Sequence, residues 1–337
     1  MGSNNYNIPV VLCFFKRVDK LILIIERIKQ IKPEKIYLLS DGGRNETEHH
    51  IIKENRKIIE GSIDWNCRVI KKYANENIGV YKNIGEGAKW IFEREDSAIF
   101  LEDDNLPELS FFDFCKELLN KYRKDTRILW ICGTNYLKNY TPEDGSSYLF
   151  TRNMMPCGWA SWADKFNRFY DGNFNSLSDS YIAKNIESDY LYKPLFRQDF
   201  QNWNDEIRRL ELKGKPASWD YQMSLTLRIH KLYGIVPKYN QIMNIGVDKD
   251  SIHGGTNLQQ VMTKRFCELP TKTLEFPLVH PKTLLVDEKF EKEIAKIITY
   301  PLFLRLKSVI SRKIKYFLKI ETEESLKQYL IQLLSKK

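Results

Sequence analysis

Apolar runs alternate with stretches of helical spacing along the first part of the sequence, and this alternation limits the folds open to the chain. The run at residues 9–15 (PVVLCFF) precedes a helical pattern at 21–31, and a second apolar run follows at 35–40. Short runs that are apolar throughout are typical of strands buried on both faces. Strands joined through helices form right-handed crossovers and a mainly parallel sheet. We therefore predict an α/β fold with a mixed, mainly parallel sheet flanked by helices.

The following sequence first extends this pattern and then departs from it. Further strands are predicted at 67–71, 97–101 and 128–132, and further helices at 79–95 and 111–122. After residue 134 the sequence is rich in aromatic residues and indicates loops with short elements. A connector punctuated by prolines then leads to a helical tail that starts at residue 287. We divide the chain into three parts, residues 4–135, 136–275 and 276–337.

The composition indicates a folded protein with a sizeable core. The chain has 337 residues, of which 42% are hydrophobic and 13% aromatic, and a disordered chain would lack this many large apolar side chains. Its six cysteines are scattered and its five histidines form no cluster, so we predict reduced structural thiols and no zinc site. No apolar stretch approaches the ~20 residues that span a bilayer, and no secretory signal is evident. The expected location is the cytoplasm.

The positive charge is concentrated near the end of the chain. The net charge is +9, and seven basic residues with no acid lie between residues 296 and 319, which leaves 9 − 7 = +2 for the rest. Because the body is nearly neutral and has no recognised binding motif, nucleic acid is not an expected partner. Apolar residues recur there at three- and four-residue spacing, opposite a set of basic residues. The apolar set is Phe303, Leu306, Ile310, Ile314 and Phe317, and the basic set is Arg305, Arg312 and Lys319.

Two interpretations of this amphipathic tail stay open. A basic amphipathic helix can lie in the interface of an anionic membrane, which would make the protein peripheral on the inner face of the cytoplasmic membrane. The same pattern fits a helix that packs on its own catalytic domain or on a second subunit.

An acidic tripeptide, Glu102-Asp103-Asp104, follows the predicted strand at 97–101. In open α/β sheets, ligands bind at the carboxyl ends of the strands. Adjacent carboxylates repel one another, so burying them requires a counter-charge such as Mg²⁺ or Mn²⁺, which prefer oxygen ligands. The alternative is a solvated acidic turn. Arg17 and Asp41 follow the first and second strands, and they are expected at the same sheet edge.

Seven motifs together resemble a known family. In chain order they are PVVLCFFKR, LLSDG, NIGVYKN, SAIFLEDDN, CGWASW, SWDYQ and NIGVDKDSIHGG. Their order over about residues 8–260 is similar to that of GT-A glycosyltransferases related to N-acetylglucosaminyltransferase I, and closer still to the haemolysin-like relatives found with bacterial polysaccharide genes. The resemblance implies a Rossmann-like GT-A fold, with residues 4–135 as the nucleotide-sugar-binding half and 136–275 as the acceptor-binding and catalytic half.

The resemblance also implies roles for individual residues. Asp104 is expected to bind the metal, Mn²⁺ or Mg²⁺, and Asp220 to be the catalytic base. Arg17 and Asp41 are expected on the uridine side of a UDP-sugar, and His253 on a loop over the diphosphate. The residues predicted to contact the nucleotide sugar are Arg17, Asp41, Asn77, Lys82, Glu102, Asp103, Trp159 and His253.

The sequence departs from the family pattern at three places. Tyr221 follows Asp220 where the eukaryotic members have a second acid, Ile252 stands where a hydroxyl residue precedes the His-Gly pair, and a histidine expected after NIGV is absent. These differences concern the donor sugar and the phosphate contacts.

Two of the predicted residues have structural alternatives. An acceptor hydroxyl needs a base to remove its proton, and Asp220, which follows Trp219, is the best candidate. Asp220 also precedes a helical stretch, so its alternative role is a helix cap. Trp159, next to Gly158, can stack on a sugar ring or pack in the core.

We therefore predict an inverting glycosyltransferase that moves a sugar, with N-acetylglucosamine as one candidate, from a UDP-sugar to a saccharide or lipid-linked saccharide acceptor. Surface polysaccharide or glycolipid synthesis is the expected context. Two rivals remain. A sugar nucleotidyltransferase would need a glycine-rich phosphate loop where this chain has FFKRVDK, and a non-catalytic carbohydrate-binding protein would act on membranes through the tail.

Overall fold

A computed structural model describes residues 6–214, 216–248, 257–318 and 329. The chain divides into two compact units, Met1–Ile297 and Ile298–Lys337. Among the described residues, no helix has the length and apolar character needed to cross a membrane.

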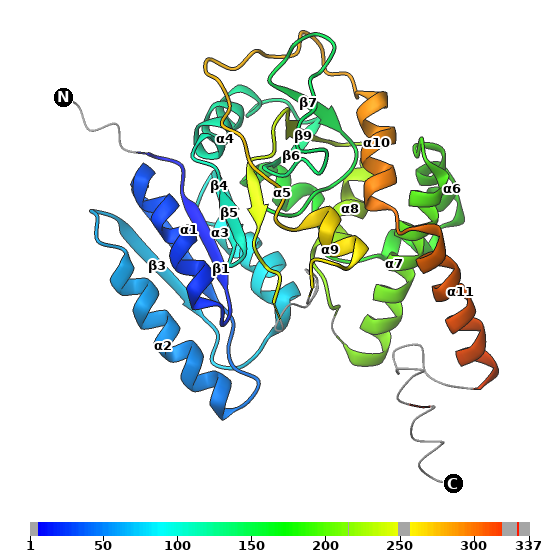
Figure 1. The fold of residues 1–337 in the computed structure, drawn as a ribbon, viewed down its shortest axis with the longest axis horizontal. Helices are drawn as coiled ribbons and strands as arrows, with labels where there is room; N and C mark the ends of the chain where they lie inside the picture. The colour runs from blue at the N-terminus through cyan, green and yellow to red at the C-terminus, as the bar shows by residue number, and fades with distance from the viewer. Residues whose placement is uncertain (1–5, 215, 249–256, 319–328, 330–337) are drawn as a thin grey trace. The chain divides into compact units, whose positions relative to one another are not determined.

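The described part of the first unit is organised around an eight-stranded sheet with the order β3-β2-β1-β4-β8-β6-β9-β7 (Figure 1). The pairs β3–β2, β2–β1, β1–β4 and β6–β9 are parallel, whereas β8 and β7 run antiparallel to their neighbours. The mixed, mainly parallel sheet is therefore confirmed. The strands are β1 (Val10–Phe14), β2 (Lys35–Ser40), β3 (Arg68–Tyr73), β4 (Ser97–Glu102), β6 (Ile128–Cys132), β7 (Tyr148–Thr151), β8 (Trp159–Trp162) and β9 (Tyr233–Pro237).

The central strands are buried on both faces, which explains why their sequences are apolar throughout. Every residue of β1 is buried, and β1 pairs in register with both neighbours, so that Val10 lies opposite Ile36 of β2 and Ile99 of β4. Side chains of alternate residues point to opposite faces of a sheet. Each face therefore needs its own layer of helices.

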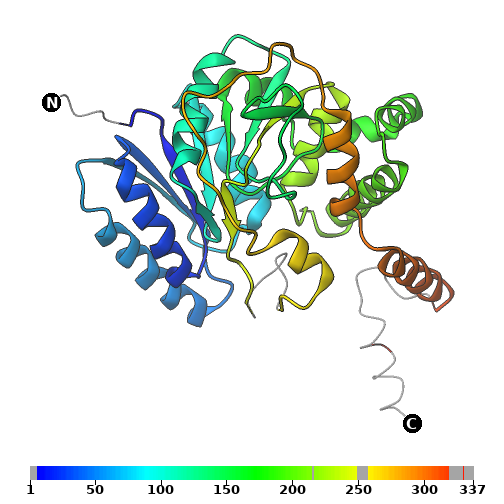
Figure 2. The same ribbon diagram turned by 45° about the horizontal axis from the view of Figure 1, so that its top comes forward.

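Helices α1 (Val18–Ile31), α2 (Glu46–Ser62) and α4 (Ser110–Lys121) cover one face of the sheet (Figures 1 and 2). Their buried residues join those of the strands in one apolar core; Leu21 and Ile25 of α1, for example, belong to the same cluster as Leu12 of β1. The amphipathic spacing predicted for α1 and α4 is therefore the spacing of their core-facing residues.

The opposite face is covered by α3 (Gly87–Phe92), α5 (Ala163–Phe169) and α8 (Asp220–Ile229). Aromatic contacts connect this layer to the sheet. The ring of Phe92 in α3 lies 5.4 Å from Phe100 of β4, and Phe166 of α5 stacks at 5.9 Å on Trp159 of β8. The helix predicted at 79–95 is interrupted, because its first part is a π-helical turn, η1 (Tyr81–Glu86).

The region after residue 134 has longer elements than the sequence indicated. The helix α7 (Lys193–Lys213) has 21 residues and begins with a proline in its first turn. It ends at Gly214 in the left-handed conformation (φ 67°). Few of its side chains are buried, so the hydrophobic periodicity that reveals a helix is weak there. The other elements are β5 (Asn105–Pro107), β10 (Ile242–Asn244), η2 (Asn175–Ser178), α6 (Ser180–Ser188), α9 (Val261–Phe266), α10 (Glu288–Ile298) and, in the second unit, α11 (Leu302–Phe317).

The sheet passes across the predicted boundary at residue 135. Strands β6 and β9 pair directly, although the first lies before this boundary and the second after it. The predicted halves therefore share one sheet, and their separate roles stay a prediction.

The start of α2 is held by a buried carboxylate. The side chain of Asn45 caps the helix by accepting a hydrogen bond from the amide of Glu48 at 3.0 Å. The Glu48 carboxylate in turn binds the side chain and the amide of Arg44 and the ammonium of Lys16. The Arg44 side chain contributes most to lowering the pKa of Glu48 to about 2.

We expect Glu48→Gln to lower the free energy of unfolding by about 1 to 2 kcal/mol at pH 7, because charged hydrogen bonds are lost. A carboxyl group whose folded-state pKa is depressed stabilises the protein above its unfolded pKa, and this stabilisation disappears as the pH falls through about 2. The difference from wild type in urea unfolding should therefore shrink between pH 4.5 and pH 2. Glu46→Gln, an exposed acid in the same turn, is the control. Equal losses in both variants would contradict the assignment.

Candidate active site

The acidic tripeptide lies where β4 ends and the chain turns into β5. Glu102 is the last residue of β4, and Asn105 begins β5, which pairs antiparallel with β10. The side-chain amide of Asn105 donates a hydrogen bond to Asp104 Oδ1 at 2.6 Å. Oδ1 of Asn105 accepts a hydrogen bond from the backbone amide of Gly158 at 2.8 Å. The turn is thus held from the side by neighbouring strands, and its carboxylates have fixed positions at the sheet edge.

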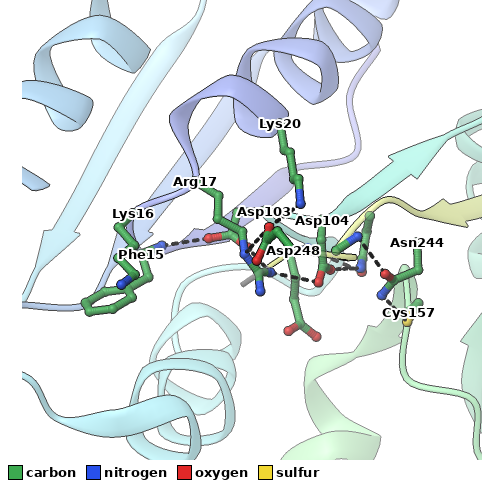
Figure 3. Close-up of polar contacts among 12 residues, drawn as sticks. Phe15, Lys16, Arg17, Lys20, Asp103, Asp104, Cys157, Asn244 and Asp248 are labelled. Atoms are coloured by element: carbon green, nitrogen blue, oxygen red, sulfur yellow. Dashed lines mark hydrogen bonds and ion pairs between the residues drawn. The ribbon is translucent and has the colours of Figure 1, made fainter. Parts of the chain in front are cut away.

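Arg17 lies against two of these carboxylates, at the sheet edge where the sequence predicted it (Figure 3). Its Nη1 is 3.0 Å from Asp104 Oδ2 and 3.4 Å from Asp103 Oδ1. The other oxygen of Asp103 accepts the amide of Phe15 at 3.0 Å. Because Phe15 and Arg17 both follow β1, the carboxyl ends of β1 and β4 are joined directly.

Asp248 is a further charged residue at this edge, and no role was predicted for it from the sequence. Its Oδ2 lies 3.3 Å from Arg17 Nε and also contacts the ammonium of Lys20 (Figure 3). Asp248 belongs to the NIGVDKDSIHGG motif, so the motif contained the signal, although the family resemblance implies a role there only for His253. His253 itself lies outside the described residues.

The positive charges of Arg17 and Lys20 do not compensate the carboxylates fully. Burial, followed by the charges of Asp104 and Asp220, raises the pKa of Glu102 well above its usual value. Burial and the charge of Asp104 raise the pKa of Asp103 to about 6, and burial also raises the pKa of Asp104. The effect of Asp220 on Glu102 shows that the fold brings the predicted base into the neighbourhood of the tripeptide.

The chemistry of this cluster fits a hard divalent cation. Its donors are carboxylate oxygens, and their excess negative charge is what such an ion neutralises. Among the described residues, no group of three or more His, Cys, Asp or Glu side chains is arranged to hold a metal ion. An ion here would have to complete its coordination with water or substrate oxygens, which is the usual situation for Mg²⁺ at phosphate sites. Asp104 is the predicted protein ligand.

The segment that follows β10 packs closely against Asp104. The amide of Ile245 donates to the carbonyl oxygen of Asp104 at 2.8 Å, immediately beyond β10. A Cβ atom at Gly246 would lie 3.0 Å from Asp104 Cγ and still closer to Oδ2. Glycine at this position therefore leaves the carboxylate of Asp104 where Arg17 and Asn105 hold it.

Asp41 is buried at the end of β2 and binds the loop that follows β3. Its Oδ1 accepts the amides of Gly42 and Ile78 at 2.7 and 2.8 Å, and its Oδ2 accepts the amide of Gly79 and the side chain of Asn77, both at 3.0 Å. Four donors occupy the lone-pair positions of a carboxylate. A uracil N–H would have to replace one of them, so a base contact by Asp41 stays a prediction.

The two residues predicted from NIGVYKN differ in their surroundings. Asn77 binds both Asp41 and the carbonyl of Gly42, so it fixes the loop. Lys82 lies in η1 with an exposed side chain. The same turn reaches the other side of the site, because a Cβ atom at Gly85 would lie 2.8 Å from the hydroxyl of Tyr170 and 3.4 Å from Trp219 Cβ.

Asp220 is the first residue of α8, and the N-cap position belongs to Trp219. Asp220 is therefore not the N-cap residue, which was the alternative role considered for it from the sequence. Asp220 contacts the hydroxyl of Ser218. The backbone before it is held by Glu206 of α7, which accepts the amides of Ala217 at 2.8 Å and Ser218 at 3.3 Å. A buried carboxylate on α7 thus positions the segment that carries Asp220.

Trp159 is a core residue in this structure. Its ring stacks between Phe100 at 3.8 Å and Trp130 at 4.3 Å, and the residue is 1% exposed. Both ring faces are therefore covered, which supports the core alternative over stacking on a sugar. The buried indole Nε1 of Trp159 has no hydrogen-bond partner among the described residues. The predicted contact with a nucleotide sugar could therefore be made only by the Nε1 edge of the ring.

Comparison with known proteins gives similarity of fold at a low level. No protein-family model matches the chain, and no curated protein matches it. A UDP-glucose pyrophosphorylase solved with UDP-glucose is 10% identical, covers 70% of this chain and 93% of its own, and has a TM-score of 0.35. The 4-diphosphocytidyl-2C-methyl-D-erythritol synthase of Anaerococcus prevotii is 10% identical, covers 58% of this chain and 85% of its own, and has a TM-score of 0.33. The bifunctional glycosyltransferase WbbM is 12% identical, covers 68% of this chain and 38% of its own, and has a TM-score of 0.32. These scores place the chain in none of their families.

The contact between the Asp41 loop and the following chain leads to a stability prediction. A Cβ atom at Gly42 would lie 2.6 Å from the amide nitrogen of Glu76, which is backbone and cannot rotate away. We expect Gly42→Ala to lower the free energy of unfolding by about 2 kcal/mol or more, measured by urea unfolding, because the loop must move off Asp41. Gly61→Ala is the control, since nothing lies within 4 Å of its Cβ position in α2. It should stabilise the protein by roughly 0.5 kcal/mol. Equal stability of the two variants would contradict the contact.

Proposed function

We propose that the protein is an inverting glycosyltransferase of the GT-A type that uses a UDP-sugar. One observation carries the proposal. Buried Asp103 and partly buried Glu102 and Asp104 lie at the carboxyl ends of parallel strands, where Arg17 pairs with both aspartates, and the charge of a fourth carboxylate, Asp220, contributes to raising the pKa of Glu102. This position in a parallel sheet is where ligands bind, and the charges suit a metal-bound diphosphate beside a base.

In this proposal, the tripeptide and Arg17 hold the donor. Asp104 is the metal ligand, and a bound Mn²⁺ or Mg²⁺ would neutralise negative charge on the leaving nucleoside diphosphate. Arg17, which contacts Asp103 and Asp104 in this structure, is placed to donate to a phosphate oxygen. Asp103 Oδ2 accepts a hydrogen bond from the backbone amide of Phe15. Its Oδ1, which contacts Arg17, is the oxygen that would also contact the donor.

Asp220 is the proposed base. Direct displacement at the anomeric carbon requires removal of the proton from the acceptor hydroxyl as the new bond forms, and one carboxylate suffices for this. The step inverts the anomeric centre. Ser218 contacts Asp220 and is itself held by Glu206, so the carboxylate has a defined orientation. The donor sugar, N-acetylglucosamine or another, and the saccharide or lipid-linked acceptor follow from the family resemblance alone.

Donor binding is the first test. We expect wild-type protein to bind UDP-sugar in calorimetric titrations only when Mn²⁺ or Mg²⁺ is present, and Asp104→Ala to weaken this binding by tenfold or more, on the order of the loss of one charged contact. Asp96→Ala, at the opposite end of β4 where the side chain is 84% exposed, is the matched control. Metal-independent binding, or unchanged binding by the Asp104 variant, would refute the proposed site.

Transfer is tested separately, with the donor and acceptor that a screen of UDP release identifies. We expect Asp220→Asn to keep donor affinity and to lose transfer by roughly 10²- to 10⁴-fold, the usual contribution of a general base. The anomeric configuration of the product, read by NMR, should be inverted. Transfer at the wild-type rate would exclude Asp220 as the base. Release of pyrophosphate from a nucleoside triphosphate and a sugar phosphate, in place of UDP release, would identify a nucleotidyltransferase.

A further inference from the structure

The helix α11 exposes its apolar side. Its large hydrophobic residues include Leu302 (62% exposed), Phe303 (58%), Ile310 (57%) and Phe317 (80%). With Leu306, Val309 and Ile314 they fall on one side of a helix with 3.6 residues per turn. Scattered exposed apolar residues are common, but a continuous stripe along a whole helix marks a contact surface.

The charge of α11 indicates what this surface contacts. The helix contains five basic residues and no acidic one, namely Arg305, Lys307, Arg312, Lys313 and Lys315. By helical geometry, Lys307 and Arg305 lie beside the two edges of the apolar stripe, Lys313 lies within it, and Arg312 and Lys315 lie on the opposite side of the helix. Long basic side chains in and beside an apolar stripe can reach anionic headgroups while the apolar residues insert among acyl chains.

A second copy of the chain is a poorer partner for the same surface. Pairing two α11 helices face to face would bring their basic residues together, and neither helix has an acid to pair with them. Like charges in that position repel one another. The helix has 16 residues, fewer than the ~20 needed to span a bilayer, so it would lie in the plane of the interface.

We propose that α11 binds the surface of an anionic lipid bilayer by inserting its exposed apolar stripe. The proposal does not depend on the function of the carboxylate site, since no residue of that site belongs to α11. It assigns the concentrated basic charge a partner, namely phospholipid headgroups with a net negative charge.

The test is flotation of the full-length protein with vesicles, with no nucleotide or metal added. We expect binding to vesicles of phosphatidylglycerol and phosphatidylcholine, weaker binding at high salt because the charges are screened, and little binding to pure phosphatidylcholine. Phe303→Ser/Ile310→Ser should weaken binding roughly tenfold or more through lost apolar insertion. Lys307→Ser/Lys313→Ser should weaken it by roughly tenfold through lost charge.

Matched controls change the same residue types elsewhere. Leu212→Ser/Leu285→Ser replaces residues that are 62% and 73% exposed outside α11, and Lys53→Ser/Lys282→Ser removes two exposed charges from the first unit. Both should bind vesicles as wild type does. Equal losses in control and α11 variants, or equal binding to neutral vesicles, would overturn the proposal. So would a mass of twice 40.0 kDa in lipid-free sedimentation that returns to 40.0 kDa in Phe303→Ser/Ile310→Ser, because a second copy would then cover the stripe.

Discussion

The ion pairs between Arg17 and the two aspartates are the interaction on which the site depends. Asp103 and Asp104 are largely buried, and carboxylates removed from water are costly unless an opposite charge accompanies them. Arg17 supplies that charge from the segment that follows β1, the strand next to β4, with distances of 3.4 Å to Asp103 and 3.0 Å to Asp104. The pairing therefore couples the end of β1 to the end of β4, and the register of these strands decides whether the charges meet. Because the pKa of each acid is still raised, the compensation is incomplete, and the site keeps an affinity for further positive charge.

Much of the fold could be predicted from local sequence, because parallel strands that are buried on both faces consist of continuous apolar runs. The strands predicted at 35–40, 97–101 and 128–132 match β2, β4 and β6 to within one residue. The signal fails where burial is weak. The helix α7 carries few buried side chains. The helix after NIGV starts as a π-helical turn in which Gly85 packs closely against Tyr170, a residue distant in sequence.

The candidate site could be predicted in part for the same reason. Arg17 and the tripeptide each follow a strand, so topology alone brings them to one edge. Asp248 and Glu206 could not be placed in this way, because their positions depend on the pairing of β5 with β10 and on the packing of α7. Trp159 shows the limit of reasoning by residue type: an indole next to a glycine suits a sugar platform, yet its two faces are covered by Phe100 and Trp130.

The antiparallel strand β8 has a consequence for where the carboxyl ends of its two neighbours lie. It separates β4 from β6, whose chain direction is the same, so the carboxyl ends of these two strands are held about 10 Å apart, twice the usual interstrand spacing. At that edge β8 only begins, and Gly158 before it presents no side chain, its Cβ position being filled by Ile242. The separation of these two strand ends beside the acidic turn is therefore set by backbone hydrogen bonds, with Ile242 packed between them, and does not depend on the identity of surface side chains.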